Sequence, residues 1–464
     1  MIARMALFAL LGAPLFAAAN FTLIIADGQG VGFNDPTPAT PIGGNPGTTL
    51  GQQRRNVFIR AVQIWGAELN SSVPIRVQAS WPELACNQNS AVLGAAGPSF
   101  VVADTPGVLP NYWYPIALAD KLAAQELIPG APDIVAFFNR NLGLQGCVTG
   151  LFFYLGLDAV TPPGTIHLLE TVLHEVAHGL GFTSTTDETN GVFCCGSDLL
   201  PSIYDRYLLD KQTGLHWDVM TSGQRAISAV NNAAKLVWDG GLVTASVPIV
   251  LAPAPELRVL TPASAAPDII GGPAAFGPPL INPINSELMP VTAEGGLACN
   301  ALSALDAAAV AGKIAIVNHG GCSLTVKVKN VQNAGAIAAI IVNNNPTLPP
   351  QNLEGVDPTI TIPSALVGQA DGAKLQNLLR FRSRIHSGVN VRFGPSAVRR
   401  AGADEANRVF IFAPSPVQPG SSISHWDVSA YPNLLMEPFD TADTDLSVKP
   451  PGDLTLPALQ QMGW

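Results

Sequence analysis

Helix-like and strand-like patterns alternate in the first half of the chain. Residues 52–70 carry apolar side chains at helical spacing, at Val57, Ala61, Ile64, Trp65 and Leu69. Residues 73–81 alternate like a strand, and residues 132–139 form an apolar run typical of a buried strand. Residues 165–182 are apolar on nearly every side and end at two glycines, which predicts a buried helix. The Ala-rich residues 218–238 also have a helical pattern. This order predicts an α/β (α+β) fold with a mixed sheet.

A second module begins where the composition changes, near residue 253. Residues 260–291 are almost free of charge and rich in Pro and Gly. Strand-like runs at residues 313–319 and 336–345 then enclose a helical pattern, and residues 359–379 supply a further strand and helix. We therefore expect a compact β-rich module with helices at residues 255–395.

The overall composition is that of a globular, loop-rich protein. Of the 464 residues, 47% are hydrophobic and only 12% are charged, and Gly and Pro contribute 44 and 40 residues. The net charge is −10, and no stripe of Lys and Arg is present, so a nucleic-acid partner is not expected.

The first 19 residues have the pattern of a secretory signal peptide. Arg4 precedes an apolar run at residues 5–16, and Ala17, Ala18 and Ala19 supply a small-residue cleavage site. The run is short for a membrane anchor, and no later stretch is long and apolar enough to span a bilayer. These features predict a secreted, extracellular protein without a membrane span after cleavage, and a periplasmic location is also compatible with them.

An even number of cysteines in an exported chain predicts disulfide bonds. The six cysteines are Cys86, Cys147, Cys194, Cys195, Cys299 and Cys322. Their positions favour a Cys299–Cys322 bond within the second module. For the others, a Cys86–Cys147 bond and a bridge that involves Cys194 and Cys195 remain open possibilities.

The predicted buried helix contains the sequence HEVAH, from His174 to His178. Residues four apart lie on one helix face, so both imidazoles can bind one metal ion. Glu175 lies about 100° round the helix axis, where it can reach a metal-bound water. Zinc lowers the pKa of such a water and the carboxylate accepts its proton, which is the chemistry of peptide hydrolysis.

A catalytic zinc ion usually takes three protein ligands, so a third is needed. Gly181 continues the motif as HExxHxxG, but the position where the compact form of this signature has its third ligand holds Ser184, a poor zinc ligand. Farther along, His425 precedes Met436 by eleven residues, and Pro438 follows.

Together these motifs resemble the metzincin zinc metalloproteases, in particular the leishmanolysin-like branch, in which a long insertion separates HExxH from the third histidine. The resemblance implies that His174, His178 and His425 bind one catalytic Zn²⁺ and that Glu175 is the catalytic base. It also implies that Met436 forms the Met-turn, a turn beneath the metal that does not ligate it. The implied function is a secreted zinc-dependent endopeptidase acting on protein or peptide substrates.

The second module resembles a protease-associated (PA) domain. The residues that carry this resemblance are Cys299, the strand 312–317, Cys322, Lys327 and the runs 333–344 and 362–367. Where the family usually has Arg before Gly, this chain has His319. The resemblance implies an accessory role in substrate access or in contacts with other proteins. The expected division is a signal peptide at 1–19, catalytic segments at 20–254 and 396–464, and a PA-like insertion at 255–395.

Two other functions remain open at this point. The chain could be a protein-binding module on a metalloprotease fold with little or no catalysis. It could also be a gluzincin-type peptidase with a carboxylate as third ligand, for which Asp205 and Asp427 are candidates. Of the remaining histidines, His167 is expected in a supporting or surface position, and His216, His319 and His386 are expected in solvent.

Overall fold

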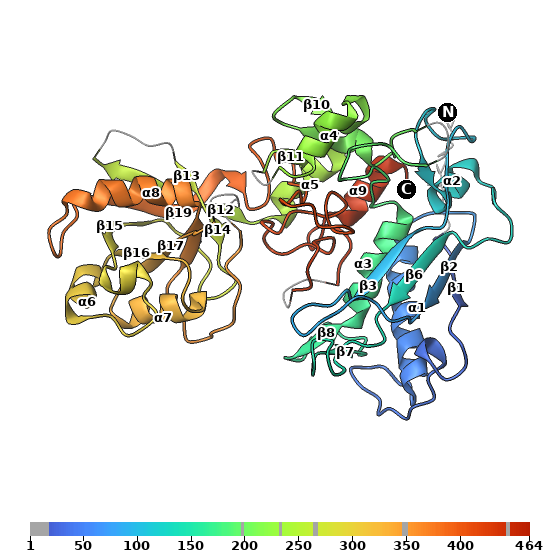
Figure 1. The fold of residues 1–464 in the computed structure, drawn as a ribbon, viewed down its shortest axis with the longest axis horizontal. Helices are drawn as coiled ribbons and strands as arrows, with labels where there is room; N and C mark the ends of the chain where they lie inside the picture. The colour runs from blue at the N-terminus through green and yellow to red at the C-terminus, as the bar shows by residue number, and fades with distance from the viewer. Residues whose placement is uncertain (1–17, 196–198, 232–233, 263–267, 346–350, 442–445) are drawn as a thin grey trace, which may run out of the picture.

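The computed structural model has two lobes (Figure 1). It describes residues 18–195, 199–231, 234–262, 268–345, 351–441 and 446–464. One lobe combines residues from both ends of the described chain, and the other is formed by the middle of the chain, between residues 253 and 400. The lobes are called here the first lobe and the second lobe.

A four-stranded mixed sheet forms the centre of the first lobe. Strands β1 (Phe21–Ile25), β2 (Ile75–Ser80) and β6 (Ile134–Phe138) are parallel, and β3 (Gly94–Pro98) pairs antiparallel with β6 at one edge. The mixed sheet predicted from the sequence is therefore present.

Two helices pack on this sheet and on each other. Helix α1 (Leu50–Glu68) starts at Thr49, whose side chain accepts a hydrogen bond from the backbone of Gln52. Helix α3 (Leu168–Leu180) ends at Gly181, where φ is +121°. Trp65 of α1 donates its indole N–H to the carbonyl of Leu173 at 3.1 Å. Every residue of α3 except His174 is buried, as its apolar pattern predicts.

Helix α3 also approaches the sheet very closely. A Cβ at Gly179 would lie 2.3 Å from a side-chain carbon of Ile134 in β6, so only glycine fits there. This contact fixes the height of α3 above the sheet and thereby the place of its histidines.

The other helices and strands of the first lobe are short. They are β4 (Val101–Val102), β5 (Tyr114–Pro115), α2 (Ile116–Ala123), β7 (Phe152–Tyr154), β8 (Thr165–His167), β9 (Leu208–Asp210), β10 (Leu215–His216), α4 (Ser222–Ser228), β11 (Leu236–Trp238), α5 (Gly241–Val250) and α9 (Thr455–Met462). The prediction of a helix through residues 218–238 is wrong over most of its length. Among its described residues, α4 is the α-helical part, and the apolar end of the stretch pairs with β9 as strand β11.

The second lobe is an eight-stranded sheet with helices on it. The strand order is β13 (Ile269–Ile270), β12 (Pro253–Thr261), β19 (Asn390–Arg400), β15 (Ile284–Pro290), β16 (Ile314–Asn318), β17 (Ala338–Val342), β18 (Ser364–Val367) and β14 (Gly272–Pro273). Strands β15 to β18 are parallel. The helices are α6 (Ala304–Val310), α7 (Leu324–Asn333) and α8 (Gln369–Leu378). Two separate apolar clusters form its core.

Short 3₁₀ segments complete the described secondary structure. They are Gly32–Asn34, Asp205–Tyr207, Trp217–Val219, Ala293–Gly296 and Leu379–Phe381.

The chain enters and leaves the second lobe through neighbouring strands. Strand β12 pairs antiparallel with β19, and Pro253 lies opposite Arg400. A second link joins the lobes at Asn352, whose amide donates to the carbonyl of Ala430 and, at 3.0 Å, to the side chain of Asn433. Beyond β19 the chain returns to the first lobe, where Trp464 donates its indole N–H to the carbonyl of Leu180 at 2.8 Å.

All six cysteines are paired. The bonds are Cys86–Cys147, Cys194–Cys195 and Cys299–Cys322. The Cys299–Cys322 bond expected in the second module is confirmed, and so is the Cys86–Cys147 possibility.

Most of the expected signal peptide, residues 1–19, lies outside the described residues. Ala19 is described: it is buried, and its N–H lies near the carbonyls of Gly66 and Leu69 at 3.1 and 3.0 Å. Within the described ranges, none of the helices combines the length and the apolar character that crossing a bilayer requires.

Candidate metal centre

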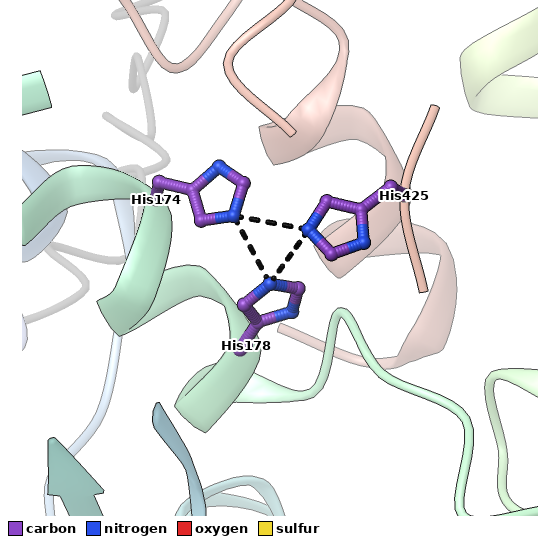
Figure 2. A group of neighbouring side chains, drawn as sticks. All are labelled: His174, His178 and His425. Atoms are coloured by element: carbon purple, nitrogen blue, oxygen red, sulfur yellow. Dashed lines mark hydrogen bonds between the residues drawn. The ribbon is translucent and has the colours of Figure 1, made fainter. Parts of the chain in front are cut away.

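Three imidazole rings from distant parts of the sequence meet at one point. His174 and His178 project from the same face of α3, and His425 comes from an irregular segment that follows the second lobe (Figure 2). The Nε2 atoms are 3.1 Å apart for His174 and His178, and each lies 3.2 Å from Nε2 of His425. The structure thus brings together the three histidines that the resemblance implies.

A backbone carbonyl fixes the outer nitrogen of each ring. Nδ1 of His174 lies 2.6 Å from the carbonyl of Leu435, and the Nδ1 atoms of His178 and His425 lie 2.7 Å from the carbonyls of Phe182 and Ser421. A carbonyl oxygen only accepts, so each Nδ1 carries the proton. In a neutral imidazole, Nε2 then presents a lone pair, and three lone pairs face one another.

Burial keeps these rings neutral. Desolvation lowers the pKa of His174 to about 4 and that of His178 to about 3, and it lowers the pKa of His425 well below its usual value. Neutral rings in this tautomer cannot hydrogen-bond to one another through Nε2, so the arrangement calls for a cation between them.

The donor set fits zinc. Imidazole nitrogens are common zinc ligands, and catalytic zinc sites use three protein ligands and leave one position open. In a tetrahedral site with Zn–N bonds of about 2.0–2.1 Å, ligand nitrogens are about 3.3 Å apart. The separations of 3.1 and 3.2 Å are close to this value.

Glu175 is buried beside the histidines and faces strand β3. Its carboxylate accepts a hydrogen bond from the backbone of Ala96, while its Oε2 has no hydrogen-bond partner among the described residues. Desolvation raises the pKa of Glu175 to about 8, and a dication at the histidines would act in the opposite direction. The strand comes so near that a Cβ at Gly94 would lie 2.7 Å from Oε1.

Met436 is fully buried in a turn that supports two of the histidines. The carbonyl of the preceding residue, Leu435, accepts from His174 at 2.6 Å. The carbonyl of Met436 itself accepts from the backbone of Trp426, next to His425, at 2.8 Å. The backbone of Leu435 is held in turn by Asp453 at 2.8 Å. The turn therefore ties α3 to the segment that carries His425.

The carboxylates considered as alternative ligands have other partners. Asp205 accepts hydrogen bonds from the hydroxyls of Ser184 and Thr186 at 2.6 and 2.9 Å. Asp427 accepts from the hydroxyl of Ser429 at 2.5 Å. Ser184, at the position of the third ligand in the compact signature, thus anchors a buried network beside the end of α3.

The other histidines lie outside the candidate metal centre. His167 is buried, which excludes a surface position: Nδ1 accepts from the backbone of Leu169 at the start of α3, and Nε2 lies 2.8 Å from the carbonyl of Asp158. His216 lies 3.0 Å from Asp239, and His386 lies 3.1 Å from Glu287. His319, expected in solvent, is half-buried.

The three histidines open into a cavity of about 710 Å³. Strand β3, the segment 419–425 and the Met436 turn line it. Its described lining includes five carboxylates and neither Lys nor Arg; the acidic residues are Glu170, Glu175, Glu188, Glu437 and Asp440. Glu170 lies in α3 with Glu175, whereas Glu188, Glu437 and Asp440 come from irregular segments that only the fold brings to this cavity, so the sequence does not mark them. The small residues of β3, Gly94–Pro98, are a weak sequence signal that another segment packs closely against this strand.

Comparisons with known proteins found similarity over parts of the chain. A 78-residue segment is 36% identical to "Signal peptide peptidase-like 2" of Arabidopsis thaliana, and it covers 16% of this chain and 14% of that relative. Solved structures with similarity include a zinc aminopeptidase from Bacillus subtilis (23% identity, 33% of this chain and 36% of that one, TM-score 0.24). Another is an aminopeptidase from Aneurinibacillus sp. strain AM-1 (18% identity, 42% and 41%, TM-score 0.23).

The PA domain family matches residues 284–375, which run from β15 into α8. The sequence-based expectation of a PA domain is confirmed, and the second lobe of this chain contains one.

Proposed function

We propose that the protein is an exported zinc-dependent endopeptidase of the metzincin type, with a leishmanolysin-like arrangement. In this proposal residues 20–254 and 396–464 form the catalytic domain, and residues 255–395 are the inserted PA-containing domain. The observation that carries the proposal is the convergence of three neutral imidazoles, each with Nδ1 on a carbonyl and Nε2 toward the others at 3.1 or 3.2 Å.

His174, His178 and His425 would hold the metal ion. When bound, zinc supplies Lewis acidity to the carbonyl of the substrate and lowers the pKa of a water molecule. Glu175 takes a proton from the attacking water and passes it to the departing amine. Its burial favours this role, because a carboxylate shielded from bulk solvent keeps the proton close to the reacting groups.

Strand β3 supplies a way to bind an extended peptide. It is the edge strand of the mixed sheet, and Gly94, Ala95 and Ala96 line the cavity beside Glu175. An edge strand presents unpaired backbone groups that can pair with a peptide strand. Such pairing acts along the length of a peptide and needs no chain terminus, which favours endopeptidase action.

The alternatives are less well supported by the same contacts. A binding protein has no need for a buried carboxylate beside the histidines, since such a group is costly to desolvate. A gluzincin-type site would take a carboxylate as third ligand, whereas the third group within 3.2 Å of the other two is the imidazole of His425.

Zinc content and proteolysis of matched variants test the proposal. The purified full chain should contain about one zinc ion, as metal analysis would measure, and should cleave casein. Glu175→Gln should keep the zinc and lose casein cleavage by about 10²–10⁴-fold. His425→Ala should lose both. His386→Ala, at an exposed histidine of the second lobe, is the control and should retain both.

Each result separates one alternative. Zinc binding without cleavage by the wild type would support the binding protein, and zinc retention by His425→Ala would support a carboxylate ligand. Export is tested separately by N-terminal sequencing of the protein recovered outside the expressing cells, which should begin near Ala18 or Ala19.

A further inference from the structure

Three carboxylates gather at a second place in the first lobe. Asp120 belongs to α2, Glu126 lies in the loop that follows, and Asp133 directly precedes β6. Their ligand oxygens all lie within 4.8 Å of one another. None of the three lines the cavity of the candidate zinc site, so the cluster is separate from it.

The cluster is buried, and part of it lacks partners. Asp120 is 2% exposed and Asp133 is 1% exposed. One oxygen of Asp120 accepts from the backbone of Leu127 at 2.8 Å, and one of Asp133 accepts from the backbone of Arg76 at 2.6 Å. Oδ2 of Asp120 and Oε1 of Glu126 are buried with no hydrogen-bond partner among the described residues.

Basic side chains do not neutralise these carboxylates in the part of the chain that the structure describes. The charged groups that act on Asp120 are Glu126 and Asp133, which are both acidic. Arg76 acts on Asp133 from a distance, but its guanidinium donates to the carbonyl of Ala131 at 2.6 Å. Two buried carboxylates and a half-buried one this close together are unfavourable unless a proton or a cation compensates their charge.

A proton meets this need only at lower pH. A carboxyl–carboxylate hydrogen bond between Asp120 and Asp133 would satisfy Oδ2, but it requires one of the two to stay protonated. Burial, with the two acidic neighbours, raises the pKa of Asp120 to about 6. Above this pH the proton leaves, and the cluster is again anionic. A bound cation satisfies these oxygens and also compensates their charge above this pH.

We propose that Asp120, Glu126 and Asp133 bind a structural calcium ion. Carboxylate oxygens are the preferred donors of Ca²⁺, at about 2.3–2.6 Å, so two ligands on opposite sides of the ion are about 4.6–5.2 Å apart and neighbouring ligands are closer. The three oxygens, all within 4.8 Å of one another, can therefore contact one such ion. Mg²⁺ needs bonds of about 2.0–2.1 Å in a near-ideal octahedron and keeps several waters, so a buried all-carboxylate cluster suits Ca²⁺ better.

The ion joins parts of the first lobe that precede the active-site helix. It links the last turn of α2 and the loop at residues 124–132 to the start of β6. Through the backbone contact of Asp133 with Arg76, it also reaches β2. Strand β6 pairs with β3, the strand that faces Glu175. Calcium therefore stabilises the sheet on which the cavity is built without taking part in the chemistry.

Thermal unfolding and calorimetric titration with CaCl₂ test the proposal on the zinc-loaded full chain. The wild type should bind about one Ca²⁺ and should gain about 3 °C or more in Tm at saturation. Glu126→Gln, at a half-buried position, should fold and lose measurable Ca²⁺ binding. Its Tm should rise by less than about 1 °C when calcium is added, which is about a third of the wild-type shift. Asp120→Asn should behave in the same way. Without calcium, Glu126→Gln should be at least as stable as the wild type, because one repelling charge is gone.

Two controls make the result specific to the cluster. Asp371→Asn removes a carboxylate from the second lobe and should respond to calcium like the wild type. His425→Ala removes a candidate zinc ligand and should still bind calcium, whatever its effect on proteolysis. The proposal is overturned if the wild type binds no Ca²⁺, if Glu126→Gln binds it as tightly as the wild type, or if MgCl₂ stabilises the wild type as well as CaCl₂ does.

Discussion

Replacing Gly94 by alanine should impair catalysis much more than folding. The added Cβ would lie 2.7 Å from Oε1 of Glu175 and 2.9 Å from its Cδ and Cγ. Ordinary contacts start near 3.4 Å, so the carboxylate must shift by about 0.7 Å (3.4 minus 2.7). The backbone of Gly94 is extended in β3 and accommodates alanine, so the strain falls on the side chain of the proposed base.

The size of the effect follows from that displacement. Misplacement of a reacting group by about 1 Å costs on the order of 10²-fold in rate, and general base catalysis contributes about 10²–10⁴-fold. A shift of about 0.7 Å should therefore reduce kcat about 10–100-fold, which corresponds to about 1.4–2.7 kcal/mol in activation free energy. Zinc content should not change, because the clash does not involve the histidines.

Gly97→Ala is the matched control in the same strand. A Cβ at Gly97 meets no atom within 4 Å, so this variant should keep full activity. The assay is kcat and KM on a fluorogenic peptide, with zinc content and Tm measured on the same samples. If Gly94→Ala cleaves the peptide within about twofold of Gly97→Ala, Glu175 does not act from the position described, and the reasoning from β3 is wrong. Loss of zinc would show that the clash reaches His174.

Three further predictions concern charge, cross-linking and burial. The described lining of the cavity has five carboxylates and neither Lys nor Arg, so peptides with Lys or Arg near the cleaved bond should have a higher kcat/KM than acidic peptides. Adding about 0.5 M salt should reduce this difference, because it screens the charges. Equal kcat/KM values for the two kinds of peptide would contradict the prediction. Replacing Cys299 and Cys322 by serine should destabilise the second lobe by about 3 kcal/mol, from the entropy of a loop of 23 residues, as measured in urea. Arg408→Ala should destabilise the first lobe by about 1.5–3 kcal/mol in the same assay, because the fully buried Asp404 loses hydrogen bonds of 2.7 and 2.9 Å but keeps two backbone donors and Lys211. A change below about 0.5 kcal/mol would show that the remaining partners suffice.

The sequence predicts those parts of the fold that depend on local pattern. Helices α1 and α3 were expected from apolar spacing because each buries one or more faces against the same sheet. His425 could be proposed from its spacing to Met436, although it lies 247 residues beyond His178. The PA domain could be recognised because its cysteines, glycines and strands recur in a fixed order.

The remaining features depend on contacts between distant segments. Nothing near Gly94 in the sequence indicates that Glu175, 81 residues later, will rest against it. The same holds for Asp120 and Asp133, whose carboxylates meet only because α2 ends beside the start of β6. Of the two positions open to His167, supporting or surface, the structure has the supporting one: His167 is buried, it caps α3, and it lies in β8, which pairs with β7. The apolar residues of β11 have a helical pattern, but β9 offers them backbone partners.

The long separation between His178 and His425 is compatible with a precise site because the intervening lobe closes on itself. The entropy lost in closing a loop grows only with the logarithm of its length, so a large insertion adds little to that cost. What matters is whether the ends of the insertion are fixed. Here β12 and β19 pair side by side from Pro253 and Arg400, and the amide of Asn352 holds the carbonyl of Ala430, six residues before Met436. The second lobe is therefore anchored beside the turn whose carbonyls position His174 and the segment of His425. The hydrogen bond of Asn352 is therefore a direct contact between the second lobe and the backbone segment that joins His425 to Met436.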